Sequence, residues 1–120
     1  MPPKAEVIIA VQGNDAIARL DLYKSILKKD GHTITFGVTS KADADGLLEV
    51  MPATTPIAII DGNLFKSKQE EAEFIQSLKA VNPKISIIGV SDEPIEGAHV
   101  NVDKKIPSEI MKLGEIVTAL

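Results

Sequence analysis

The stretch Ile57-Ala58-Ile59-Ile60-Asp61-Gly62-Asn63-Leu64 decides how the rest of the chain is interpreted. Four apolar residues lead into a carboxylate, and Gly-Asn ends the apolar run at once. A short apolar run bounded by turn residues is typical of a strand that is buried on both faces. Asp61 would then lie where this strand leaves the sheet. Ligands of open α/β folds bind at that edge, so Asp61 is the first candidate site residue.

Apolar runs alternate with helical periodicity along the rest of the chain. Further strands are expected over residues 7–11, 33–38, 85–90 and 100–102. Helices are expected from the loop at Asp15 to Lys29, from Lys41 to Met51, from Ser67 to about Val81, and from Pro107 to the end. The segment from Ser91 to Gly97 is too short for a full helix. This alternation predicts a parallel sheet with helices on both faces, in a single domain over residues 1–120.

Composition narrows the classes of function. The chain has 120 residues, of which 44% are hydrophobic and 25% charged, as in an ordinary one-core domain. A formal net charge of −4 without a basic cluster argues against nucleic acid as a direct partner. The absence of cysteine excludes disulfides and thiolate sites. The first apolar run, Val7 to Val11, is too short for a signal peptide or a membrane span, so a cytoplasmic protein is expected.

Polar side chains follow several of the predicted strands and should share one edge of the sheet. They are Gln12 to Asp15, Asp61 to Asn63, Ser91 and Lys104. A carboxylate, a hydroxyl and an ammonium could together hold a phosphoryl group, with the carboxylate as nucleophile. A hard cation such as Mg²⁺ would offset the negative charge and would take oxygen ligands.

The order of these residues resembles the receiver domains of two-component response regulators, the CheY-like family. Asp61-Gly62-Asn63-Leu64 matches the family's acceptor motif, and Ser91 matches the hydroxyl residue that closes the next strand. Gly97-Ala98 and Lys104 match the motifs around the last strand. The resemblance covers nearly the whole chain. It implies a flavodoxin-like sheet of five parallel strands in the order 2-1-3-4-5, here with the fourth helix shortened or missing.

The resemblance also implies a role for each site residue. Asp61 would accept a phosphoryl group from a phosphohistidine, and Ser91 and Lys104 would bind the phosphoryl oxygens. Mg²⁺ would be held by Asp61 and the Asn63 carbonyl, together with Asp15 and Gln12. The partners would be a sensor histidine kinase or phosphotransfer protein and a downstream protein. The chain would act by binding and signalling, not as an enzyme.

Four departures from the family pattern favour a different function. Gln12-Gly13-Asn14-Asp15 replaces the acidic pair that binds Mg²⁺, and Lys105 stands where a proline usually follows the family's lysine. Asn101 replaces an aromatic switch residue, and the fourth helix is reduced. The alternative is a phosphorylation-independent pseudo-receiver that acts as a protein-interaction module. Asp61 would then be satisfied in an ion pair with Lys104, and Asp15 would be a helix cap. A flavodoxin-like enzyme or nucleotide binder is a third, more distant class.

Overall fold

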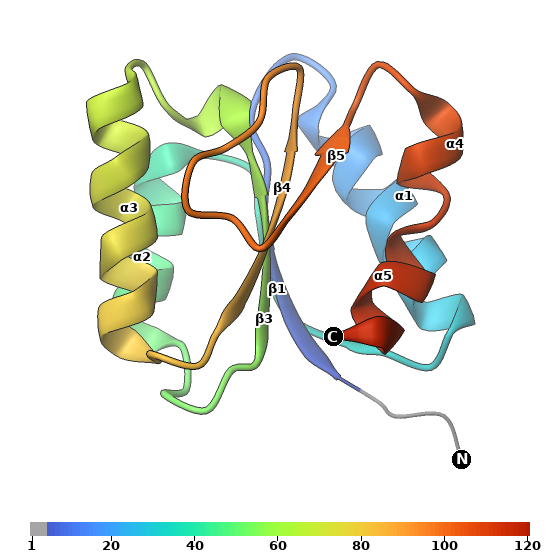
Figure 1. The fold of residues 1–120 in the computed structure, drawn as a ribbon, viewed down its shortest axis with the longest axis horizontal. Helices are drawn as coiled ribbons and strands as arrows, with labels where there is room; N and C mark the ends of the chain where they lie inside the picture. The colour runs from blue at the N-terminus through green and yellow to red at the C-terminus, as the bar shows by residue number, and fades with distance from the viewer. Residues whose placement is uncertain (1–4) are drawn as a thin grey trace.

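The computed structural model describes residues 5–120, which form one parallel sheet with helices on both faces (Figure 1). The strands are β1 (Glu6–Ala10), β2 (Thr33–Val38), β3 (Ile57–Asp61), β4 (Ser86–Ser91) and β5 (Val100–Asp103). Their spatial order is β2-β1-β3-β4-β5, and every neighbouring pair is parallel. The predicted fold class and strand order are therefore confirmed.

The helices divide into two layers. Helices α2 and α3 cover one face of the sheet, and α1, α4 and α5 cover the other (Figure 1). Their bounds are α1 (Ala16–Lys29), α2 (Lys41–Val50), α3 (Lys68–Val81), α4 (Pro107–Ile110) and α5 (Leu113–Ala119), and a 3₁₀ turn, η1 (Gly62–Leu64), follows β3. Within the described chain no helix connects β4 to β5, as predicted. Over residues 5–120, no helix combines the length and the apolar character needed to span a bilayer.

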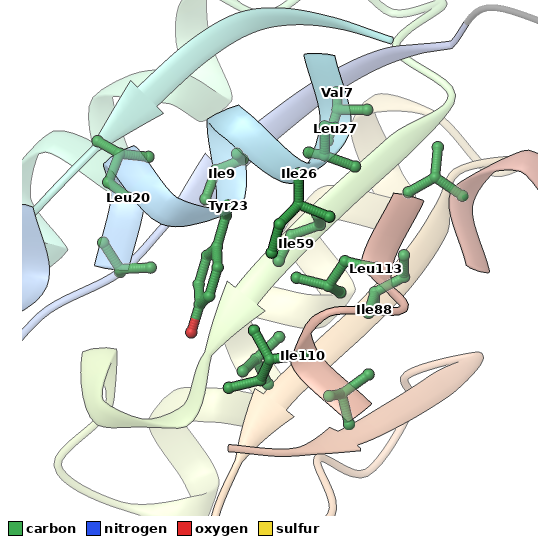
Figure 2. Packing of buried hydrophobic residues seen from close by; sticks show 14 of the residues in the cluster. Val7, Ile9, Leu20, Tyr23, Ile26, Leu27, Ile59, Ile88, Ile110 and Leu113 are labelled. Carbon is green, nitrogen blue, oxygen red and sulfur yellow. The ribbon is translucent and has the colours of Figure 1, made fainter. Parts of the chain in front are cut away.

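The central strands are buried because helices pack on both of their faces. On the α1 side, Ile9, Ile59 and Ile88 pack against Tyr23 and Leu27, and all five side chains are fully buried (Figure 2). The continuous apolar runs of β1, β3 and β4 are what such a sheet requires, because each of these strands has no solvent-facing side. Asp61 is the last residue of the central strand β3 and therefore lies at the carboxyl edge of the sheet.

Two expectations about the helices were wrong in detail. The last helix is divided into α4 and α5, because near Lys112 the backbone bonds change to the tighter i−3 spacing, with Lys112 N 3.1 Å from Glu109 O. A Cβ at Gly114 would collide with the Asp30 carboxylate, so α5 approaches the end of α1 closely. The apolar spacing of the sequence turns Ile17 toward the core, but Ile17 is 71% exposed, and the buried residue of that turn is Ala16.

Candidate functional site

Asp61 is fully buried at the carboxyl end of β3, and both of its carboxylate oxygens have partners. Oδ1 accepts a hydrogen bond from the Asn63 backbone N–H at 3.0 Å and lies 3.4 Å from the Lys104 ammonium. Oδ2 accepts a hydrogen bond from the Arg19 guanidinium. A buried carboxylate is stable only with such compensation. The site is thus a carboxylate held between two cations.

Arg19 reaches the site from the first turns of α1. It lies on the same helix face as Ala16 and Tyr23, three residues after one and four before the other, so it points toward the sheet. Burial alone would lower the pKa of Arg19. The charge of Asp61, its hydrogen bond and the nearby Asp15 outweigh burial and raise this pKa above its ordinary value. The guanidinium therefore remains protonated beside Asp61 at every physiological pH.

The loop before α1 supports the Arg19 side chain. The Gln12 carbonyl accepts a hydrogen bond from Nη2 of Arg19 at 2.5 Å, and Asp15 Oδ1 lies 3.1 Å from Nε. Gly13 has a φ of 125°, a backbone conformation that residues with a Cβ rarely adopt. A Cβ there would lie 3.2 Å from Arg19 Nη2. Gly13 thus lets the loop turn closely around the guanidinium.

The structure does not bring the side chains of Gln12 and Asp15, two of the four expected Mg²⁺ ligands, into contact with Asp61. The side chain of Gln12 points elsewhere, since its Oε1 accepts a hydrogen bond from the backbone N–H of Lys41 at 2.7 Å. The Asp15 side chain is 71% exposed and lies against Arg19. Among residues 5–120, no group of three His, Cys, Asp or Glu side chains is suited to a metal ion. Arg19 places a positive charge directly against Oδ2 of Asp61.

The two phosphoryl-binding candidates lie in different places. The Lys104 ammonium is next to Asp61, as expected, whereas Lys105 is exposed and its backbone N–H bonds Asp103. Ser91 packs against Gly62, where an added Cβ would collide with its hydroxyl. The described chain shows no hydrogen bond between Ser91 and Asp61, and the Ser91 hydroxyl lies 3.4 Å from the Glu93 backbone N–H. The structure therefore brings Lys104, but not Ser91, into contact with Asp61.

Access to Asp61 is closed. Two cavities flank the end of β3, one of about 400 Å³ that includes Ser91 and one of about 280 Å³ that includes Arg19 and Lys104. Asp61 lines neither of them, and its side chain is 0% exposed. An incoming group would have to displace Arg19 or Lys104 to reach the carboxylate.

The segment that replaces a helix between β4 and β5 is held by Asn101. Its Oδ1 accepts a hydrogen bond from the Ile95 backbone N–H at 2.8 Å, and its Nδ2 lies 3.4 Å from the Ile95 carbonyl. The Ile95 side chain is buried against the α3 side of the core. The resemblance places a mobile aromatic side chain at residue 101. In this chain Asn101 is there instead, and its amide is hydrogen-bonded to the backbone of the neighbouring loop.

Arg19 was missed by the sequence analysis. Only residues that follow strands were considered as site residues, and Arg19 lies within a helix. Two signals were present in the sequence. Arg19 is the sole arginine of the chain, and it falls on the helix face of Tyr23, which the apolar pattern turns toward the core. A charged residue on the core-facing side of a helix requires a buried partner.

Comparison with known proteins identifies the fold. No family model and no curated protein matches the sequence. Among solved structures, the receiver domain of the putative response regulator NarL from Mycobacterium tuberculosis matches with a TM-score of 0.71 and 15% identity, covering 98% of both chains. The structure of the CheA3 P1 domain in complex with CheY6 from R. sphaeroides gives 0.68 and 17%, covering 97% of this chain and 98% of that chain.

A third similar structure has a different description. A putative pilus assembly-related protein from Burkholderia pseudomallei matches with a TM-score of 0.67 and 16% identity, covering 96% of this chain and 90% of that chain. At these identities the likeness concerns the fold. The chain has the CheY-like receiver-domain fold, and its function must be argued from the site.

Proposed function

We propose that this chain is a receiver-like protein-interaction module that works without phosphoryl transfer. The observation that carries the proposal is the ion pair between Arg19 and the fully buried Asp61. A nucleophilic carboxylate must present an oxygen lone pair to the phosphorus of the donor. Here Oδ2 accepts from the guanidinium, Oδ1 accepts from Asn63, and Asp61 lines neither of the two cavities that flank the end of β3.

The Asn101–Ile95 contact supports the same proposal. Phosphorylation-dependent output needs an element that has two arrangements of similar free energy. In this chain the segment between β4 and β5 is fixed by the Asn101 side chain and by the buried Ile95. A fixed segment offers a partner the same surface at all times. Binding to that partner would then be constitutive.

The phosphoryl-acceptor function predicted from the sequence is the second candidate. It is favoured by the Lys104 ammonium 3.4 Å from Asp61 and by the Asn63 N–H that orients the carboxylate. In that case a sensor histidine kinase or phosphotransfer protein would be the donor, and Arg19 would have to leave the carboxylate before transfer.

The two candidates are separated by incubation with acetyl phosphate and Mg²⁺, followed by intact-protein mass spectrometry. The wild type should gain no phosphoryl group. The wild type is compared with Arg19→Gln, which is checked for folding by circular dichroism. In this variant the Asp61 carboxylate has lost its main cationic partner. Labelling of the wild type that is absent in Asp61→Asn would contradict the proposal and establish the acceptor function.

The interaction itself can be tested with the same reagent. Proteins retained by the immobilised chain are compared before and after treatment with acetyl phosphate and Mg²⁺. The proposal predicts the same retained proteins and the same affinity in both conditions, because the surface does not depend on Asp61 chemistry. A partner that binds only after treatment would favour the second candidate.

A further inference from the structure

Glu71 is a buried carboxylate for which the Asp61 site has no use. Its side chain is 7% exposed. It lies three residues before Phe74 and four before Ile75, on the face of α3 that packs against the sheet. Among the described residues its cationic partner is Lys68, at 3.7 Å, a distance too long for a hydrogen bond. The charge of Glu71 is therefore compensated less well than that of Asp61.

Lys68 is a weak partner for this carboxylate. Its side chain is 65% exposed, and its ammonium also lies 3.8 Å from the carboxylate of Glu93. One exposed ammonium thus faces two carboxylates and lies beyond hydrogen-bond distance of both. A buried carboxylate is costly without hydrogen bonds, so Glu71 has acceptor capacity that the chain itself leaves unused.

Glu71 lines the cavity of about 400 Å³ that includes Ser91. This cavity lies where the start of α3 and the segment after β4 meet the end of β3 (Figure 1). Over residues 5–120, the fully enclosed side-chain polar atoms without a partner are Arg19 Nε and the Tyr23 hydroxyl, and the Glu71 oxygens are not among them. The carboxylate is therefore open to a group that enters the cavity.

The charges around this cavity favour a cation. Three carboxylates and two ammonium groups line it, which leaves one negative charge; they belong to Glu71, Asp92 and Glu93, and to Lys66 and Lys68. The ion pairs that these residues form within the described chain join members of this set, so no ion-pair partner outside the cavity cancels that charge. Phe65 also lines the cavity, and an aromatic ring attracts a guanidinium that stacks on it.

We propose that this cavity receives the arginine side chain of a partner protein. The guanidinium donates hydrogen bonds to Glu71 inside the cavity and pairs with Glu93 at its rim, while Lys68 turns toward solvent. A guanidinium presents five N–H donors in one plane, whereas an ammonium is a point charge, so this set of groups favours arginine over lysine. The inference deepens the proposed function and rests on it, because it names the contact through which the interaction module holds its partner.

The test is an amide NMR titration of the whole chain with N-acetyl-arginine methylamide and, separately, with the corresponding lysine compound, both at constant ionic strength. Saturable shifts at Gly62, Glu71 and Glu93 are expected with the arginine compound, and the lysine compound should bind about threefold more weakly. Glu71→Gln should weaken binding of the arginine compound about tenfold, the effect of one hydrogen bond to a charged group. Absence of saturation, or equal binding of the two compounds, would overturn the inference.

Charge variants around the cavity supply the controls. Glu73→Gln removes the same charge from an exposed position of α3 outside this cavity and should leave the affinity unchanged. Glu93→Gln alters an exposed side chain, so it tests the site even if Glu71→Gln disturbs folding, and it should weaken binding about threefold. Lys68→Gln removes the competing ammonium and should tighten binding by a similar factor. Equal effects of Glu71→Gln and Glu73→Gln, or weaker binding to Lys68→Gln, would overturn the inference.

The proposed function has a separate readout. It fails if intact mass shows a phosphoryl adduct at Asp61 after acetyl phosphate treatment, whatever the arginine titration gives. The arginine site fails if saturation or its dependence on Glu71 is missing, even when the mass of the protein is unchanged.

Discussion

The guanidinium of Arg19, on α1, is paired with the carboxylate of Asp61 at the end of β3. The positive charge that balances this buried acid is therefore covalently part of the chain. It does not dissociate, and a chelator cannot remove it.

The first prediction concerns the free energy of unfolding. Asp61→Asn should destabilise the wild type by about 3 kcal/mol, because it leaves Arg19 and Lys104 partly buried beside a neutral group. In the Arg19→Met background the same change should be stabilising, because there it removes a buried charge that has lost its main partner. Urea unfolding of the four proteins measures both effects.

An exposed ion pair provides the control. The side chain of Asp45 is 52% exposed and bonds Lys41 one turn away on α2. Asp45→Asn should cost less than about 1 kcal/mol. Equal effects of Asp61→Asn in the wild type and in Arg19→Met would contradict an interaction between Arg19 and Asp61.

The raised pKa of Tyr23 predicts that the folded protein loses stability at alkaline pH. Burial raises its pKa in the folded chain above the ordinary value of 10.0, so the unfolded chain loses the phenolic proton first. The stability contributed by the neutral phenol is complete below pH 10.0 and is lost as pH rises through the folded pKa. Tyr23 is the only tyrosine and tryptophan is absent, so tyrosinate absorbance reports this group alone.

The corresponding measurement is an absorbance titration of folded and urea-unfolded protein. The folded midpoint should lie above the unfolded one, and Tyr23→Phe should lose less stability than the wild type above pH 10.0. Coincident midpoints would show that the hydroxyl is accessible in the folded chain.

Asn101 is predicted to hold the segment between β4 and β5. Asn101→Ala removes both contacts to the Ile95 backbone and should cost about 1 kcal/mol, with faster hydrogen exchange of the Ile95 amide. Asn82→Ala is the control, since it removes a 2.8 Å bond to the Thr55 carbonyl, and neither residue belongs to this segment. If exchange at Ile95 is unaffected by Asn101→Ala, the segment is held by other contacts.

The Ser91 side chain is predicted to leave room only for glycine at residue 62. A Cβ at residue 62 would collide with the Ser91 hydroxyl and lie 2.9 Å from its Cβ, so Gly62→Ala should cost about 2 kcal/mol. Ser91→Gly removes both of these atoms. In the double variant the loss should be smaller than the sum of the two single losses, and strict additivity in urea unfolding would argue against the contact.

The strand order could be predicted because buried parallel strands leave a strong local signal. The apolar runs of β1, β3 and β4 end at turn residues, and their alternation with helices restricts the topology. The division of the last helix could not be predicted in the same way. The apolar spacing of Ile110, Leu113 and Val117 continues through the break, so the sequence pattern gives no sign of the i−3 backbone bond at Lys112.

The site was predicted only where strand ends determine it. Asp61 ends β3 and Lys104 follows β5, and the parallel topology places both of these strand ends on the same edge of the sheet. The orientation of Ser91 toward Gly62 depends on local packing, which residue spacing does not encode. Arg19 belongs to a helix, and the reach of its side chain to the sheet edge appears only in three dimensions.

The most direct test of the central claim is an amide NMR titration with Mg²⁺ followed by beryllofluoride, a phosphoryl mimic. The account predicts no shift at Asp61, Asn63, Ser91 or Lys104 in the wild type, because Arg19 occupies the carboxylate. Saturable shifts at these residues in the wild type, absent in Asp61→Asn, would contradict it and show that Arg19 yields to a phosphoryl group.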